Sequence, residues 1–361
     1  MPPANAIAGL QTDAQRSAHI RAQVLAHGIE LRQRYPLLRH QDALGVAILA
    51  LALGGMLGSA ALYFDGHLAG WACVLLNAFF ASLTHELEHD LIHSMYFRQR
   101  RLPHNLMLAL VWLARPSTIN PWVRRHLHLN HHKVSGTEAD LEERAITNGE
   151  PWGPARLLMV GDNMMSSFIR LLRARTARHK WSILSRTLKV YAPLGLLHWA
   201  TWYLFLGFHA IDGLGAWLAT PPAWSASTLQ LMAVVNGAVV VLVGPNVLRT
   251  FCLHFVSSNM HYYGDVEPGN LIQQTQVLNP WWLWPLQLFC CNFGSSHAIH
   301  HFVVKEPFYI RQLSLPVAHR VMRDMGVRFN DFGTFTRANR WTRRAERQST
   351  TPHAATLTGS E

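Results

Sequence analysis

Residues 43–64 read ALGVAILALALGGMLGSAALYF and contain no charged side chain. At about 1.5 Å per residue, a helix of this length crosses the ~30 Å hydrocarbon core of a bilayer. The short turn Asp65-Gly66-His67 leads into a second apolar stretch at residues 68–84, and two further apolar stretches cover about residues 190–208 and 229–248. Each pair predicts a membrane hairpin. We therefore expect an all-α integral membrane protein with two transmembrane helical hairpins.

The distribution of positive charge predicts the orientation of these hairpins. The formal net charge is +11, a value also found in nucleic-acid-binding proteins. Arg and Lys are concentrated in residues 1–42, 94–189 and 302–361, whereas residues 65–68 and 210–227 contain none. This bias follows the positive-inside rule and places both termini, the middle region and every histidine cluster on the cytoplasmic side. A basic cytoplasmic face meets anionic lipid, so we expect no nucleic-acid partner.

Three histidine clusters flank the apolar stretches. They are His85-Glu-Leu-Glu-His89, His128-Leu-Asn-His131-His132 and His297-Ala-Ile-His300-His301. Imidazole is the commonest side-chain ligand of transition metals, and eight imidazoles are too many for one ion. Residues i and i+4 share a helix face, so each H-x-x-H-H helix can present three nitrogens to one cavity. The clusters predict a redox or hydrolytic centre with two metals, held in a cytoplasmic histidine-rich helical cap.

Other polar residues near the clusters are further candidates. His261 follows the fourth apolar stretch on the metal side, and we expect it to be a ninth ligand. His93 extends the first cluster by one turn. Whether it, His126 or His254 also binds a metal stays open. A ligating imidazole usually donates its second N–H to a carboxylate. Three carboxylates interleave with the first cluster and could take that role: Glu86, Glu88 and Asp90.

Over residues 40–335 the chain resembles the integral-membrane fatty acid desaturase and hydroxylase superfamily, in the histidine clusters, their order and the flanking hairpins. The resemblance implies two non-haem iron ions that activate O2 to attack an unactivated C–H bond of an acyl chain. The Asn-Met-His-Tyr-Tyr-Gly segment around His261 resembles the alkane-hydroxylase branch, where a corresponding histidine is a ligand. The implied ligands are His85, His89, His128, His131, His132, His261, His297, His300 and His301.

The same motifs leave the reaction open. His-Glu-Leu-Glu-His-Asp-Leu-Ile-His and Gly-Ser-Ser-His-Ala-Ile-His-His-Phe are also similar to bacterial membrane enzymes that decarboxylate free fatty acids to 1-alkenes. We expect a fatty acid desaturase, with oxidative decarboxylation and hydroxylation as alternatives. The chain contains no C-x-x-C pair or dinucleotide fingerprint. A separate electron donor such as a ferredoxin or rubredoxin is therefore expected.

Two other classes of protein fit less well. His85-Glu86-Leu-Glu-His89 matches the H-E-x-x-H pattern of zinc proteases, in which the glutamate acts as base. A protease needs one further ligand, which leaves most of the other histidines without a purpose. A metal transporter would place its ligands at mid-membrane, whereas these clusters lie beyond the apolar stretches.

The sequence divides into a cytoplasmic N-terminal segment at 1–42, a membrane di-iron domain at 43–335 and a basic, partly disordered tail at 336–361.

A saturated chain has to reach the metals through an apolar tunnel between the hairpins. If its head group is a free carboxylate, a basic residue is needed near the tunnel mouth. The nearest candidates by sequence are Arg124, Arg125 and Arg249.

Overall fold

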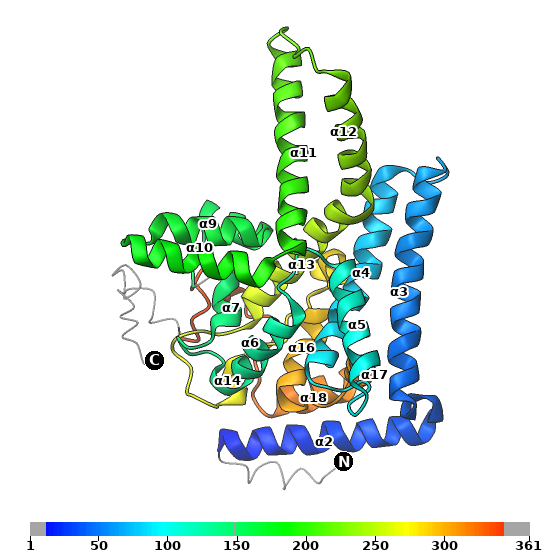
Figure 1. The fold of residues 1–361 in the computed structure, drawn as a ribbon. Helices are drawn as coiled ribbons and strands as arrows, with labels where there is room; N and C mark the ends of the chain where they lie inside the picture. The colour runs from blue at the N-terminus through cyan, green and yellow to red at the C-terminus, as the bar shows by residue number, and fades with distance from the viewer. Residues whose placement is uncertain (1–11, 148, 343–361) are drawn as a thin grey trace.

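The computed structural model describes residues 12–147 and 149–342. In these residues the regular structure is helical, with two isolated bridges, His261–Thr275 and Val277–Phe329, and no longer strand. The all-α prediction is confirmed. Long upright helices rise from a compact body of shorter ones (Figure 1).

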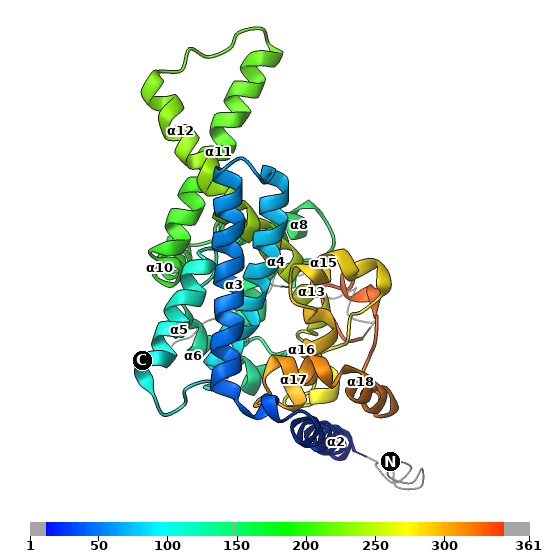
Figure 2. The ribbon, with the colours of Figure 1, turned by 90° about the vertical axis from the view of Figure 1, so that its right-hand side faces the viewer.

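The first long pair is α3 (Gln41–Phe64) and α4 (Gly70–Ile92), which run antiparallel and pack side by side (Figures 1 and 2). A Cβ atom at Gly55 of α3 would lie 2.4 Å from the Phe80 ring of α4, so the close packing there depends on glycine. α4 continues past the predicted apolar stretch, which ends at residue 84. Its last two turns carry His85 and His89 down into the body.

The second long pair is α11 (Leu194–Trp217) and α12 (Ala226–Ala238), whose outer ends project beyond the rest of the molecule (Figure 1). α12 continues through a π-helical turn, η2 (Val239–Val243), into α13 (Gly244–Met260). Pro245 lacks a backbone N–H and disturbs the hydrogen-bond ladder at this junction. Asn77 of α4 donates to the carbonyl of Val241 at 2.7 Å and so ties the junction to the first pair.

Three helices are long and apolar enough to cross a membrane by length and composition: Gln41–Phe64, Leu194–Trp217 and Ala226–Met260. They expose large apolar side chains, among them Leu57 (72% exposed) and Trp217 (80%), as lipid contact requires. The sequence predicts four spanning stretches, one of which lies in α4. α4 is not among the helices that are apolar enough over a sufficient length. His85 and three carboxylates occupy its lower third.

The middle region contributes six helices to the body: α5 (Arg101–Ala114), α6 (Pro121–Val134), α7 (Leu141–Ile146), α8 (Pro154–Gly161), α9 (Asn163–Arg173) and α10 (Ala177–Tyr191). α9 and α10 lie across the direction of α11 (Figure 1). Asn120 and Pro121 begin α6: the Asn120 side chain accepts a hydrogen bond from the Trp122 N–H, and Pro121 is preorganised for the first turn.

The C-terminal part completes the body with η3 (Trp281–Leu283), η4 (Phe332–Thr334) and five helices: α14 (Leu271–Gln274), α15 (Trp284–Leu288), α16 (Phe293–Phe302), α17 (Phe308–Leu313) and α18 (Leu315–Asp324). α2 (Asp13–Arg34) runs along the base against α14, α16 and α18, and η1 (Pro36–Arg39) joins it to α3. Arg32 of α2 bonds Glu306 at 2.6 Å. The three tryptophans of residues 281–284 are exposed, Trp281 most of all at 86%, whereas Leu283 is buried.

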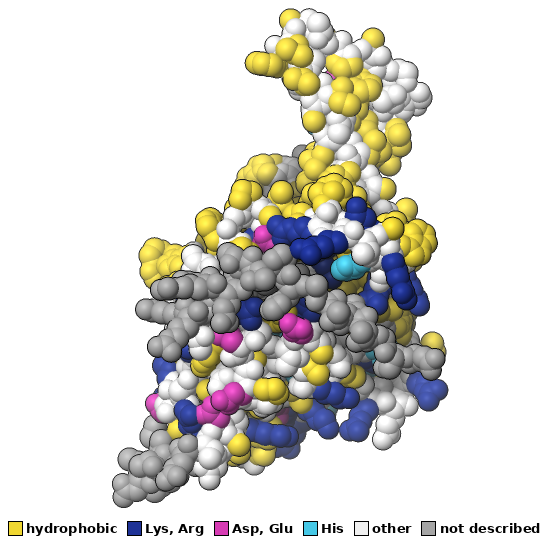
Figure 3. All heavy atoms as spheres, turned by 90° about the vertical axis from the view of Figure 1, so that its left-hand side faces the viewer, with side chains coloured by type: hydrophobic (Ala, Val, Ile, Leu, Met, Phe, Trp, Pro, Cys, Tyr) yellow, Lys and Arg dark blue, Asp and Glu magenta, His cyan; other side chains and the backbone are white. Residues whose placement is uncertain are grey.

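The end of the chain is partly within the body. Residues 336–342, which the sequence analysis assigns to the tail, contact the segment after α13: the Asn339 side chain donates to the His261 carbonyl at 2.8 Å. The rest of the predicted tail, residues 343–361, and residues 1–11 lie outside the described residues. On the face shown in Figure 3, Lys and Arg lie over the body and the projecting hairpin shows none.

Candidate metal centre

Histidines from α4, α6, α13 and α16 converge in the middle of the body. Their side chains form two groups, each with ligand nitrogens within 4.8 Å of one another. The first group is His89, His93, His128, His132 and His300, and the second group is His131, His261, His297 and His301.

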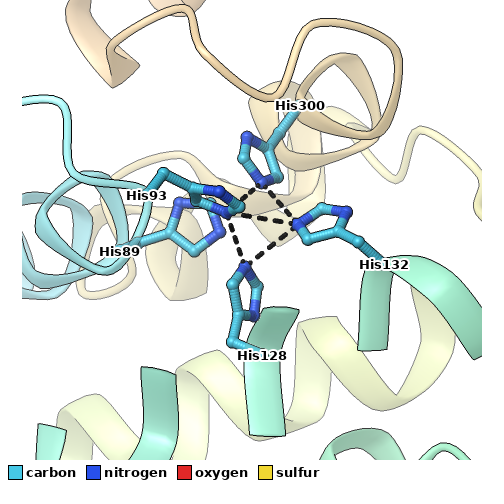
Figure 4. A group of neighbouring side chains, drawn as sticks. All are labelled: His89, His93, His128, His132 and His300. Atoms are coloured by element: carbon cyan, nitrogen blue, oxygen red, sulfur yellow. Dashed lines mark hydrogen bonds between the residues drawn. The ribbon is translucent and has the colours of Figure 1, made fainter. Parts of the chain in front are cut away.

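In the first group the rings point toward one another from three separate helices (Figure 4). The Nε2 atom of His93 lies 3.0 Å from that of His128 and 3.1 Å from that of His300. The Nε2 atoms of His132 and His300 are 2.9 Å apart. Imidazole nitrogens bound at about 2.1 Å to one metal, at right angles to each other, are themselves about 3.0 Å apart. The spacing of the first group therefore fits one bound ion.

The second group is smaller and wholly buried. The Nε2 atom of His297 lies 3.2 Å from that of His261 and 3.3 Å from that of His301. The ring of His131 completes the set, 5.3 Å from the His301 ring between centroids. Four imidazoles converging at this spacing also fit a single ion, and the chain thus offers two adjacent sites.

The H-x-x-H-H helices serve both groups at once. On α6, His128 and His132 belong to the first group and His131 to the second. On α16 the assignment is reversed: His297 and His301 belong to the second group and His300 to the first. Residues i and i+4 share one face of a helix, and the middle histidine points to the neighbouring face. The prediction that each motif faces one cavity is therefore refined: each helix stands between two sites.

His85 is the one predicted ligand that the structure leaves outside both groups. Its Nδ1 atom lies 3.3 Å from Nη1 of Arg115, and its ring contacts Phe293. His93, which the sequence left open as a ligand, occupies the ligand position in the first group that was expected for His85. The motif H-x-x-x-H-x-x-x-H contains two overlapping pairs, and α6 and α16 meet α4 at its lower end, about 6 Å beyond His85. His126 and His254 also lie outside both groups.

Three carboxylates from one short segment orient the histidines. Nδ1 of His128 bonds Glu142 and Nδ1 of His131 bonds Asp140, each at 2.8 Å. Nδ1 of His261 lies 3.3 Å from Glu143. These contacts fix each ring with Nε2 toward its group. Sequence reasoning missed them, although the acidic stretch at residues 138–143 follows directly after the second cluster.

The carboxylates of α4, which the sequence offered for this role, pair with arginines instead. Arg311 bonds Glu86 at 3.0 Å and Asp90 at 3.1 Å. Glu88 is paired with Arg115 and Arg124. Because Glu86 is held by Arg311, it is not free to act as the base of an H-E-x-x-H zinc protease.

Burial keeps most of these imidazoles neutral and able to bind metal. It lowers the pKa of His297, His300 and His301 well below the ordinary value. Burial also acts on His131, but the hydrogen bond and charge of Asp140 outweigh it and raise the pKa to about 9. Burial and the neighbouring carboxylates raise the pKa of Glu143 to about 8 despite His131. A metal ion at the second group would displace the His131 proton.

A partly open cavity reaches both groups. His89 and His128 of the first group and His131 and His297 of the second line it, together with apolar side chains such as Leu253 and Ile119. A substrate in this cavity would lie against both sites.

The donor set fits a transition metal. Nine imidazoles and no thiolate suit iron, copper, nickel or zinc, and the rings are already spaced as ligands. Both nitrogens of His89 are buried without a hydrogen-bond partner among the described residues, which suits a ring that binds a metal.

Comparison with known proteins agrees with this geometry. The profile of the fatty acid desaturase family matches residues 65–333, which include all three histidine clusters. No curated protein matches the chain significantly. The match and the three candidate membrane helices indicate a membrane protein, and the histidine groups fit the metal site of a desaturase-type oxidoreductase. The chain belongs to the fatty acid desaturase family.

Proposed function

We propose that the protein is a membrane-bound, O2-dependent di-iron oxidase that attacks a C–H bond of a fatty acid or acyl chain, as a fatty acid desaturase. The observation that carries this proposal is the pair of imidazole groups built from the same helices. We assign one iron to each group, with His93 in place of His85. Iron bound there would supply the activation of O2 that attack on an unactivated C–H bond requires.

In desaturation the chain loses two hydrogen atoms and gains a double bond. O2, with those hydrogens and with two electrons and two protons from outside, becomes two waters. The residues of this chain hold and orient the centre: Asp140, Glu142 and Glu143 keep the rings in place. Leu253, Ile119 and Phe293 give the cavity apolar walls against which methylene groups can pack, at ~0.8 kcal/mol per buried CH2.

The proposed topology places the two helix pairs in the bilayer as hairpins, with the body and both termini in the cytoplasm. The positive charges support this arrangement, because they lie on the body and not on the connections at the outer ends. α9 and α10, which lie across α11, are suited to the headgroup region. We also propose a separate electron-donor protein, since electrons are required and the basic body can attract an acidic partner.

The test is metal and product analysis on the purified protein. We expect two irons per chain and, with reductant, electron donor, O2 and saturated substrates, an unsaturated product of unchanged length. One zinc and no iron would contradict the proposal and favour a protease. A hydroxylated product of unchanged length would replace desaturation with hydroxylation, and CO2 with a terminal alkene one carbon shorter would replace it with oxidative decarboxylation.

A further inference from the structure

Four arginines are almost completely buried: Arg115, Arg156, Arg249 and Arg311. Arg115 and Arg311 are paired with carboxylates of α4. Arg156 donates to three backbone carbonyls and to the side chain of Asn339. A buried cation without such partners is strongly disfavoured, so the environment of each arginine is informative.

Arg249 of α13 is the exception. Its Nε atom lies 3.4 Å from Asn246 Oδ1, and its Nη2 atom lies 3.4 Å from Ser117 Oγ and 3.1 Å from Thr250 Oγ1. These three partners are neutral. Its Nη1 atom is buried with no hydrogen-bond partner, and no carboxylate of the described residues forms an ion pair with it. The guanidinium lacks a counter-charge.

Arg249 lines the same cavity as the histidines of both groups. Besides His89 of the first group, two more lining residues have a buried nitrogen without a partner: His85 at Nε2 and His254 at Nδ1. The other arginine on the cavity, Arg124, is already bonded to Glu88 and Glu142. The part of the cavity wall around Arg249 therefore offers unpaired nitrogens to an anion, and the apolar part suits a hydrocarbon chain.

We infer that Arg249 binds the carboxylate of the substrate inside this cavity, so that the substrate is a free fatty acid and not a thioester or a phospholipid. The inference rests on the proposed function for the identity of the chain. A carboxylate supplies the missing counter-charge and can accept two parallel N–H bonds from a guanidinium. A thioester carries no charge at this position and leaves Arg249 unpaired. Because the carboxylate and the metals share one cavity, the carbons closest to the head group are the ones brought to the centre.

The first experiment measures binding and needs no turnover. Radiolabelled palmitate and methyl palmitate are titrated onto the purified full chain in detergent. Wild type should prefer the acid. Arg249→Gln should weaken acid binding roughly ten- to a hundredfold, with ester binding and iron content unchanged, and Arg249→Lys should recover part of the loss. Arg320→Gln, an exposed site, is the control for loss of one charge.

A second pair of variants tests the same site without removing Arg249. Ser117→Asp places a carboxylate beside Nη2 of Arg249, and Ser117→Asn places a neutral side chain of the same shape there. The aspartate should neutralise the guanidinium and reduce acid binding relative to the asparagine variant. Ester binding should be equal in the two.

Equal binding of acid and ester by wild type overturns the inference. A parallel loss of acid and ester binding in Arg249→Gln, with equal acid binding by the two Ser117 variants, also overturns it and leaves Arg249 a structural role. Acid-selective binding that depends on Arg249, in a protein that oxidises no substrate, would support the site and contradict the proposed function, so the two can fail separately.

Discussion

His85 and His93 lie about one helical turn on either side of His89, and His93 caps the end of α4. The structure places His89 and His93 in the first group and leaves His85 outside it. His93→Ala should remove one ligand from a site whose other ligands remain. Iron bound per chain should fall from two toward one, with loss of activity, whereas His85→Ala should retain both irons. Elemental analysis of the two purified variants provides the check. Full iron content in His93→Ala together with loss in His85→Ala would restore the pair predicted from the sequence.

Asp140 affects the second group through His131, which it contacts at Nδ1. Asp140→Asn keeps a side chain that can cap α7 but removes the negative charge from the ring. We expect roughly ten- to a hundredfold weaker metal affinity at the second group, the usual cost of losing such a contact. Chelator competition measures it. Glu138→Gln, an exposed site in the same acidic stretch, should change nothing; an equal loss there would indicate a general charge effect.

At the scale of helices, the junction between α12 and α13 sets the position of Arg249 and His261. Asn77→Leu removes the donor to the Val241 carbonyl and leaves that oxygen unpaired at the π-helical turn. The free energy of unfolding should fall by ~1–3 kcal/mol. Thermal unfolding in detergent measures the loss. Asn236→Leu, which removes an exposed contact with His209 between α12 and α11, should have a smaller effect; the opposite order would show that the junction is not held by α4.

The same helices explain which features the sequence could predict. Apolar composition located α3, and the H-x-x-H-H spacing predicted that two helices present histidines to a metal centre, because both depend on local periodicity. The division of each motif between two groups was not predicted. The surroundings of the end of α4 were not predictable: α6 and Arg311 of α17 pack against its polar last turns. His93 and the carboxylates of residues 140–143 were missed or left open for the same reason. Their roles depend on contacts between segments far apart in sequence.

For the whole molecule, the two metal groups join parts of the chain that are otherwise distant. α4, α6, α13 and α16 all contribute imidazoles, so bound metal should stabilise their packing by mass action. Removal of iron by a chelator should lower the unfolding temperature and increase hydrogen exchange in α6 and α7. Readdition of ferrous iron should reverse both changes. Unchanged stability of the metal-free protein would show that the body is held by its apolar core alone.

The orientation in the membrane follows from charge across the whole chain and can be tested by labelling. Thr220 lies in the connection between α11 and α12, and Arg21 lies on α2 at the opposite end of the molecule. Both are exposed, whereas three of the four native cysteines are buried. With a membrane-impermeant maleimide on intact cells, Thr220→Cys should react and Arg21→Cys should react only after the membrane is opened. Asp65→Cys, in the turn after α3, should follow Thr220→Cys because both connections lie at the ends away from the basic body. Labelling of Arg21→Cys alone in intact cells would invert the topology and place the histidine groups outside the cytoplasm.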